Sequence, residues 1–316
     1  MTSTPLPLAV STDLLTGAEW NPNRVRDLFQ LSADVKARPG QYGAALAGRF
    51  LALILEKPSL RTRVTFEVGM RSLGGTAIFL DQTVSRLGER ESIPDVARNL
   101  SRWVHGIVAR VFEQRELDQL AEFSNVPVIN ALSDRFHPCQ AYADFFTLLE
   151  RYGTLRGLKL AYVGDGNNVC NSLMSAAARV GAEIRVATPP GYEPDASIVA
   201  ETRQAARETR GAVEVLHSPE QAVEGAQAVY TDVWASMGQE EEADARRVIF
   251  EPYQVNEALM ARARPDALFM HCLPAHRGEE VTDAVIESRQ SVVFDQAENR
   301  LHAQKALLVE LLGRKN

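Results

Sequence analysis

The sequence has few of the residues that crosslink small secreted proteins. Its 316 residues include only three cysteines, Cys139, Cys170 and Cys272, which are too few for a disulfide framework, so we expect a reducing, cytoplasmic setting. No run of about 18 apolar residues occurs, so no membrane-spanning helix is expected. The first 20 residues also lack the basic stretch and apolar core of a secretory signal.

The chain lacks an excess of positive charge. Its formal net charge is -7 at pH 7, which argues against a general nucleic-acid-binding protein, although local basic clusters could still bind small anions. No repeat and no low-complexity tract stands out. What remains is an ordinary composition, 45% hydrophobic and 24% charged, with enough apolar material for the cores of about two domains.

Short apolar runs alternate with amphipathic stretches along the chain. We expect strands at 49–55, 76–80, 106–111, 126–130, 160–163, 183–187, 213–216, 228–231, 267–270 and 291–294. We expect helices at 61–73, 93–103, 114–123, 138–152, 168–180, 196–209 and 300–312. This alternation predicts an α/β fold of two doubly wound parallel-sheet domains with a cleft between them. The break at 153–157 would end the first domain at residue 152, and a last helix at 300–316 would pack back on it.

Three strand-to-helix junctions in the first half and the middle of the chain carry polar groups. Ser59-Leu60-Arg61-Thr62-Arg63 opens a helix, where guanidinium groups and free N–H groups favour a phosphate; a polar cap with solvated arginines is the alternative. Arg110 ends the strand at 106–111 and would point into the same crevice or form an edge salt bridge. His137-Pro138-Cys139-Gln140 could bind a carbonyl oxygen and an amide, or could be structural.

The run Tyr162-Val163-Gly164-Asp165-Gly166-Asn167-Asn168-Val169 only weakly matches a dinucleotide-binding motif. Val169 occupies the third glycine position, and the next strand ends in Thr188-Pro189-Pro190 rather than in an acidic ribose ligand. An NAD-dependent oxidoreductase is therefore disfavoured. The loop could present Asn168 to a carboxylate or an amine, or could be a tight turn.

Two further candidates lie after strands in the second half. Asp232 would suit a substrate ammonium group, with Gly238 allowing a flexible loop nearby; a surface loop is the alternative. Cys272 follows the strand at 267–270, and Pro274 prevents the ladder from continuing. The residues alone leave four roles open for Cys272: nucleophile, zinc ligand, polar contact or buried packing residue.

The ordered set of motifs resembles the aspartate/ornithine carbamoyltransferase family. The matching segments are residues 56–63, 110, 137–140, 164–168, 232–238, 271–274 and 297–300. The resemblance implies transfer of the carbamoyl group from carbamoyl phosphate to the side-chain amine of L-ornithine, giving L-citrulline and phosphate, with no metal and no cofactor. Another amine acceptor (putrescine, acylated ornithine or aspartate) and a non-catalytic protein of the same fold stay open.

The resemblance also implies the organisation of the protein. It implies a carbamoyl-phosphate-binding domain at residues 1–152, an ornithine-binding domain at residues 153–299, and a homotrimer, or a multiple of trimers, with active sites at subunit boundaries. The expected partners are these two substrates, with neither nucleic acid nor membrane.

The site residues follow from the same resemblance. Carbamoyl phosphate would meet Ser59, the backbone of Leu60, Arg61, Thr62, Arg86, Arg110, His137, Pro138, Cys139, Gln140, Leu273 and Arg300. Ornithine would meet Asn168, Asp232, Ser236, Met237 and Cys272. The expected catalytic residues are Arg61, Arg110, His137, Asp232 and Cys272. The chain departs from the family at Leu60, where members commonly have Thr, and at Arg86, where many have Gln in a loop that reaches the neighbouring subunit.

Overall fold

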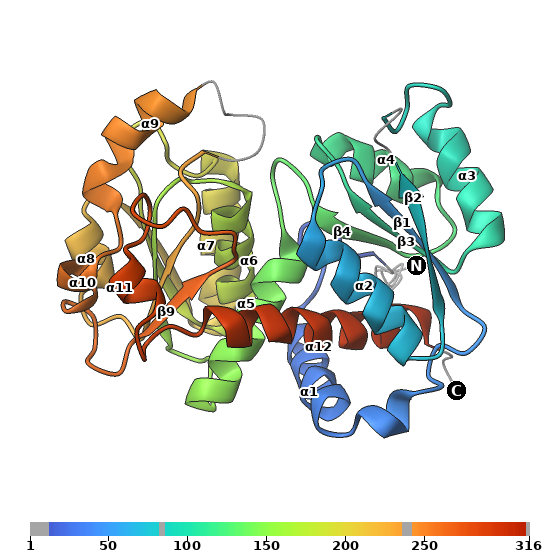
Figure 1. Ribbon diagram of the computed structural model, residues 1–316, viewed down its shortest axis with the longest axis horizontal. Coiled ribbons are helices and arrows are strands. Elements are labelled where there is room, and N and C mark those ends of the chain that lie inside the picture. The colour runs from blue at the N-terminus through green and yellow to red at the C-terminus, as the bar shows by residue number, and fades with distance from the viewer. Residues whose placement is uncertain (1–12, 82–85, 236–241, 314–316) are drawn as a thin grey trace, which may run out of the picture.

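Two parallel β-sheets, each flanked by helices, lie side by side in the computed structural model, which describes residues 13–81, 86–235 and 242–313 (Figure 1). The first sheet has the order β2-β1-β3-β4 and the second the order β7-β6-β5-β8-β9. In both sheets the chain leaves a central strand first toward one edge and later toward the other. The predicted α/β fold with two doubly wound sheets is confirmed.

The elements of the first half have the following bounds. The strands are β1 (Phe50–Leu55), β2 (Thr76–Asp81), β3 (Gly106–Arg110) and β4 (Val128–Leu132). The helices are α1 (Pro22–Ala37), the short 3-10 helix η1 (Pro39–Tyr42), α2 (Leu60–Ser72), α3 (Ile93–Trp103), α4 (Gln114–Phe123) and α5 (Pro138–Tyr152).

The second half continues the alternation. Its strands are β5 (Lys159–Val163), β6 (Glu183–Ala187), β7 (Ala212–Leu216), β8 (Ala228–Thr231) and β9 (Leu268–His271). Its helices are α6 (Asn168–Val180), α7 (Ala196–Thr209), α8 (Pro219–Val223), α9 (Ala243–Phe250), η3 (Glu251–Tyr253), α10 (Glu257–Met260), α11 (Asp283–Ile286) and α12 (Val293–Leu312). None of the described helices combines the length and hydropathy that crossing a bilayer requires.

One expected strand, at 291–294, is wrong. Ser291 makes only an isolated bridge to Phe269, and helix α12 begins at Val293, before the expected start at Arg300. A short apolar run does not distinguish a buried strand from the buried start of a helix, which explains the error. Helix α1 was not expected, although Asn21 caps it and Pro22 occupies its first turn.

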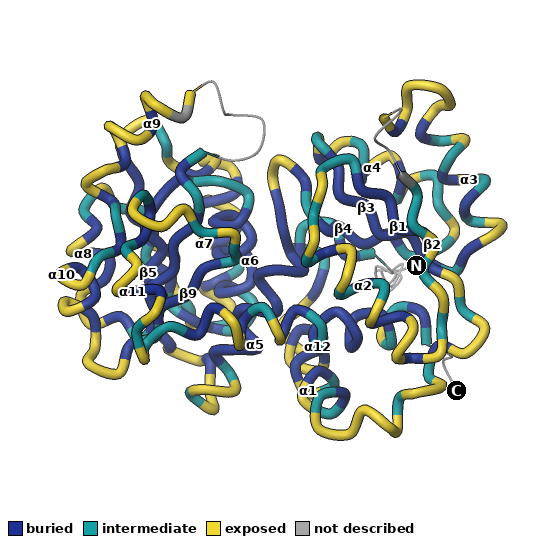
Figure 2. The backbone as a smooth tube through the Cα atoms, viewed as in Figure 1, coloured by how far each residue is buried: buried dark blue, intermediate teal, exposed yellow. Residues whose placement is uncertain are grey.

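Helix α12 connects the two halves. It contacts β9 of the second sheet and packs against α5, α1 and α2 (Figure 1). Figure 2 shows that α5 and α12 are buried along much of their length, as are the strands of both sheets. The two halves therefore share a continuous interior along these helices.

A buried carboxyl group lies at this junction. The side chain of Asp144 on α5 accepts hydrogen bonds from Gln140 Nε2 at 2.7 Å, from Gln296 Nε2 on α12 at 2.7 Å and from the Tyr230 hydroxyl on β8 at 3.0 Å. Burial raises the pKa of Asp144 to about 7, against the opposing effect of these three donors. The junction thus contains a group that titrates near neutral pH.

We expect this group to make stability depend on pH. The folded-state pKa of Asp144 exceeds the ordinary value of 3.8, so between about pH 4 and pH 7 the unfolded chain releases a proton that the folded chain keeps. The free energy of unfolding therefore falls as pH rises through that window. In urea denaturation, the free energy of unfolding of Asp144→Asn relative to that of the wild type should increase by up to about 4 kcal/mol between about pH 4 and pH 7. Above about pH 7 the difference should stay constant. A difference that does not change with pH would contradict the prediction.

Candidate active site

A cavity of about 380 Å³ is lined by residues from both halves of the molecule. It contains these expected site residues: Ser59, Leu60, Arg61, Thr62, Arg110, His137, Gln140, Asn168, Asp232, Cys272, Leu273 and Arg300. Most of them follow the carboxyl ends of parallel strands, which is where α/β proteins bind ligands. A larger hollow of about 640 Å³ lies elsewhere, but Arg49 and Glu310 are the only charged residues in its lining.

Three of the remaining expected residues, Pro138, Cys139 and Arg86, are not among the described residues that line the cavity. Pro138 and Cys139 are buried in the first turn of α5, where the Cys139 thiol donates to the carbonyl oxygen of Asn130 at 3.3 Å. Arg86 is exposed, and its guanidinium lies 4.2 Å from the centroid of the Phe112 ring. Ser236 and Met237 lie outside the described residues. A substrate contact by any of these residues stays a prediction.

The start of helix α2 forms one end of the cavity. Ser59 caps the helix, because its hydroxyl oxygen accepts from the Thr62 N–H at 3.3 Å. The Thr62 hydroxyl accepts from Arg300 Nη2 of α12 at 3.4 Å. Leu60, which replaces the family's usual Thr, is 76% exposed. Free N–H groups, a hydroxyl and a guanidinium therefore converge where the helix dipole favours an anion.

Three guanidinium groups, from Arg61, Arg110 and Arg300, line the same end of the cavity. Burial, together with the charges of Arg300 and Arg61, lowers the pKa of Arg110 to about 10, so Arg110 is still charged at neutral pH. Burial also holds the pKa of His137 well below its usual range, with the three arginines acting in the same direction. A neutral imidazole among fixed positive charges suits a phosphate next to a carbonyl oxygen.

The orientation of the Gln140 amide is fixed from two sides. Its Nε2 donates to Asp144, and its Oε1 accepts from Arg300 Nη1 at 2.5 Å. The oxygen of this amide is therefore directed to the side of Arg300 that lines the cavity. There it could accept a hydrogen bond from a ligand N–H group.

A carboxylate and a thiol, from Asp232 and Cys272, also line the cavity. Asp232 Oδ1 accepts from the Cys272 thiol and from the Val233 N–H, each at 2.9 Å. Asp232 Oδ2 accepts from Asn167 Nδ2 at 2.9 Å, while the Asn167 oxygen caps α6. Burial raises the pKa of the Cys272 thiol well above its usual range, and the Asp232 charge and hydrogen bond raise it further. Cys272 is therefore a neutral hydrogen-bond donor here, which disfavours a thiolate nucleophile.

Asn168 bridges the two halves of the molecule. Its Nδ2 donates to the carbonyl oxygen of Ser133 at 2.5 Å. The nitrogen of this amide is thus engaged with the first half, so any ligand N–H group would meet its oxygen.

Among the lining residues that were not expected at the site, two have titratable side chains, Lys57 and His276. Lys57 is half-buried, and burial lowers its pKa, with Arg110 acting in the same direction. Its Nζ lies 4.7 Å from the centroid of the same Phe112 ring that Arg86 covers. His276 follows the Cys272 corner. Both lie within or beside motifs noted in the sequence, so position in the motif was the available indication.

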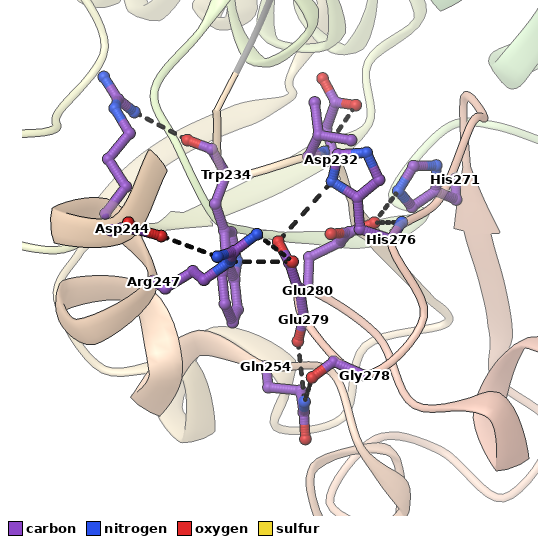
Figure 3. Close-up of polar contacts among 12 residues, drawn as sticks. Asp232, Trp234, Asp244, Arg247, Gln254, His271, His276, Gly278, Glu279 and Glu280 are labelled. Atoms are coloured by element: carbon purple, nitrogen blue, oxygen red, sulfur yellow. Dashed lines mark hydrogen bonds and ion pairs between the residues drawn. The ribbon is translucent and has the colours of Figure 1, made fainter. Parts of the chain in front are cut away.

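Two clusters among the described residues place potential metal donors close together. In the first, of Asp232, His271 and Cys272, His271 Nδ1 accepts from the Leu273 N–H at 2.8 Å and Nε2 contacts Glu280 at 3.1 Å, so neither ring nitrogen is available. In the second, of His276, Glu279 and Glu280, Glu279 pairs with Arg247 at 2.9 Å (Figure 3). Neither cluster is arranged as a ligand set.

The fold and cavity define an α/β protein with two doubly wound domains and a cavity lined by three guanidinium groups. Residues 12–150 match the family model described as the aspartate/ornithine carbamoyltransferase carbamoyl-P binding domain, and residues 156–311 match its Asp/Orn binding domain. The chain belongs to the aspartate/ornithine carbamoyltransferase family.

Individual relatives match nearly the whole chain. An ornithine carbamoyltransferase of Pyrococcus abyssi is 52% identical over 303 residues, which are 95% of this chain and 96% of the relative. The Pyrococcus furiosus protein named "Ornithine carbamoyltransferase, anabolic" is 57% identical over 268 residues, 85% of each chain. The solved structure titled ornithine carbamoyltransferase from Pyrococcus furiosus has a TM-score of 0.94 at 51% identity and covers 99% of this chain and 100% of its own.

The protonated state of Cys272 predicts low reactivity. We expect iodoacetamide to alkylate Cys272 in the native protein at least about tenfold more slowly than free cysteine at about pH 8.5, where an ordinary thiol is half ionised. Asp232→Asn removes the negative charge that raises the thiol pKa and should increase the rate. Mass spectrometry of the Cys272 peptide measures both rates. Alkylation at the free-cysteine rate, or no acceleration in Asp232→Asn, would contradict the assignment.

Proposed function

We propose that this protein transfers the carbamoyl group of carbamoyl phosphate to the side-chain amine of L-ornithine, giving L-citrulline and phosphate. The observation that carries the proposal is the presence, in the lining of one cavity, of three guanidinium groups and the Asp232–Cys272 pair. The guanidinium groups fit the phosphate of an acyl phosphate, and the Asp232–Cys272 pair fits an amine. The relatives described above carry the same activity in their names.

In the proposed reaction the neutral amine attacks the carbonyl carbon directly. A C–N bond forms, the C–O bond to phosphate breaks, and the proton that the amine gives up leaves with the phosphate as hydrogen phosphate. Phosphate is already an activated leaving group, so the chemistry requires neither a metal nor an organic cofactor. The protein contributes positioning and charge stabilisation.

The first half of the chain, residues 1–152, is proposed to hold carbamoyl phosphate, with the last helix packing back on it. Arg61, Arg110 and the start of α2 receive the phosphate, and Thr62 and Arg300 lie beside it. His137, being neutral, donates one N–H to the carbonyl oxygen.

Two acceptors then orient the carbamoyl amide. These are the oxygen of Gln140 and the carbonyl oxygen of Leu273. Together with the donors around the carbonyl oxygen, they fix the plane of the carbamoyl group for attack.

The second half, residues 153–299, is proposed to hold ornithine. Asp232 and Cys272 orient the reacting amine, and Asn168 contributes from the edge of the cavity. Ser236 and Met237 are proposed to contact the substrate and to exclude water, on the strength of the family resemblance.

A biosynthetic role is also proposed, because one close relative is named anabolic. We place this chemistry in the cytoplasm, since all three cysteines are free thiols, as expected in a reducing compartment.

We propose that the protein assembles as a homotrimer, or a multiple of trimers, through the outer face of α2 and the edge strand β2. Leu60, Val64 and Val68 repeat at helical spacing on α2 and are 76%, 46% and 45% exposed. Ile78 on β2 is also exposed, at 44%. An apolar face beside the phosphate end of the cavity supports an interface that borders the active site.

The proposed function is tested by supplying carbamoyl phosphate with ornithine, putrescine, N-acetylornithine or aspartate and measuring the carbamoylated product. We expect ornithine to be preferred. Arg61→Ala should lower kcat by about 10²–10³-fold, because a charge-stabilising group is lost. Arg115→Ala removes an exposed arginine outside the cavity and is the matched control, expected within about twofold of wild type. Failure to form a carbamoylated product with any of the four acceptors would sink the proposal, and preference for another amine would correct it.

The proposed interface is tested by Val64→Asp and Val68→Asp. A charge in each exposed apolar position should dissociate the assembly and lower activity, whereas Val248→Asp, at a position 75% exposed on α9, should leave the assembly intact. Analytical ultracentrifugation measures the mass of each variant. Unchanged mass in both α2 variants would place the interface elsewhere.

A further inference from the structure

We infer that Glu280, acting through His271, is the positioning residue that fixes the Cys272–Leu273 corner of the active site. The inference rests on the proposed function, in which Cys272 faces the amine and Leu273 faces the carbamoyl amide. Glu280 is not among the residues that line the cavity, and it lies outside the sequence motifs described above. Its role follows from a chain of buried hydrogen bonds.

The corner itself has an unfavourable backbone conformation. Leu273 has φ +57°, in the left-handed region that residues with a Cβ rarely adopt. It lies two residues after His271, the last residue of strand β9. Such a conformation persists only where neighbouring contacts hold it.

The first of these contacts comes from His271. Its Nδ1 accepts the N–H of Leu273 at 2.8 Å, so a side chain bonds to the backbone two residues further along, as in an Asx turn. The His271 N–H donates to Gln296 Oε1 at 3.0 Å, which anchors the start of the corner to α12.

This geometry determines which imidazole nitrogen carries the proton. A backbone N–H can only donate, so Nδ1 must be unprotonated and the proton of the neutral ring must lie on Nε2. Nε2 lies 3.1 Å from Glu280 Oε1, and both side chains are fully buried. The carboxylate therefore accepts a hydrogen bond from the Nε2–H group and favours the tautomer that the corner requires.

The same carboxylate oxygen holds the far end of the corner. Glu280 Oε1 also accepts from the His276 N–H at 2.6 Å (Figure 3). Glu280 is itself anchored, because its carbonyl oxygen accepts from the Val255 N–H at 2.9 Å. One buried oxygen thus fixes both ends of the segment 271–276, with Cys272 and Leu273 between them.

The cost of this arrangement supports a specific role. Glu280 Oε2 is buried and has no hydrogen-bond partner among the described residues. Burying a carboxylate with incomplete hydrogen bonding is unfavourable, so a packed apolar residue would serve stability as well. What an apolar residue cannot do is accept the two hydrogen bonds that shape the corner.

Kinetics of Glu280 variants test the inference. Glu280→Ala removes the acceptor, frees His271 to place its proton on Nδ1, and lets the corner shift; we expect kcat to fall by about 10²-fold, as for small misplacements of a reacting group. Glu280→Gln keeps an oxygen for both donors and should stay within about threefold of wild type. Glu279→Gln, whose side chain turns outward to Arg247, is the matched control, expected within about twofold.

A second pair of variants, at His271, tests the inference independently if Glu280→Ala does not fold. His271→Asn can still accept the Leu273 N–H from its side-chain oxygen, whereas His271→Leu cannot. The Asn variant should therefore keep at least about tenfold more kcat than the Leu variant, a difference of about 1.4 kcal/mol. Equal loss in the two, or equal activity of Glu280→Ala and wild type, would overturn the inference.

A spectroscopic measurement separates this inference from the proposed function. Nitrogen-15 NMR of the histidine rings, assigned with His271→Asn, should show His271 protonated on Nε2 alone in the wild type and should lose that signature in Glu280→Ala. This readout needs no substrate, so it holds even if no citrulline forms. A wild-type His271 protonated on Nδ1 would refute the positioning role.

Discussion

Three positive charges held close together inside one cleft are the constraint on which the rest of the site depends. Arg61, Arg110 and Arg300 come from different elements, and their mutual repulsion adds to the burial that lowers the pKa of Arg110 to about 10. The surrounding groups add no further positive charge. The imidazole of His137 is neutral, and the Gln140 side-chain oxygen accepts a hydrogen bond from Arg300. A bound phosphate would remove the repulsion, so these groups are organised for an anion.

Holding the third guanidinium requires the chain to return to its first half. Arg300 lies on α12, which follows the whole second domain in sequence and packs against α5 and α2. The buried hydrogen bonds of Asp144 on α5 hold α12 in this position, because they join α5 to β8 through Tyr230 and to α12 through Gln296. Polar groups here specify one alignment of the two halves, which apolar packing alone would leave less defined.

Local chemistry explains which parts of the fold and site could be predicted from the sequence. Helix α5 was predicted at its observed bounds because Pro138 marks its start and Gly153 its end. The cavity-lining residues that follow strands could be predicted as neighbours because each sits in a short motif. The strand expected at 291–294 was wrong because its three consecutive apolar residues, at 292–294, show no periodicity that distinguishes a strand from a helix. Glu280 could not be found, since an adjacent pair of glutamates resembles a solvated surface until the fold brings His271 against it.

Asp232 already uses most of its capacity to accept hydrogen bonds in contacts within the protein. A carboxylate has about four acceptor positions, and Asp232 has three donors bound to it, from Cys272, Val233 and Asn167. About one position therefore remains for a substrate, which suits a single N–H of a neutral amine better than the three of an ammonium group. The donors that fix Asp232 would thus favour the amine in the protonation state that can attack a carbonyl carbon.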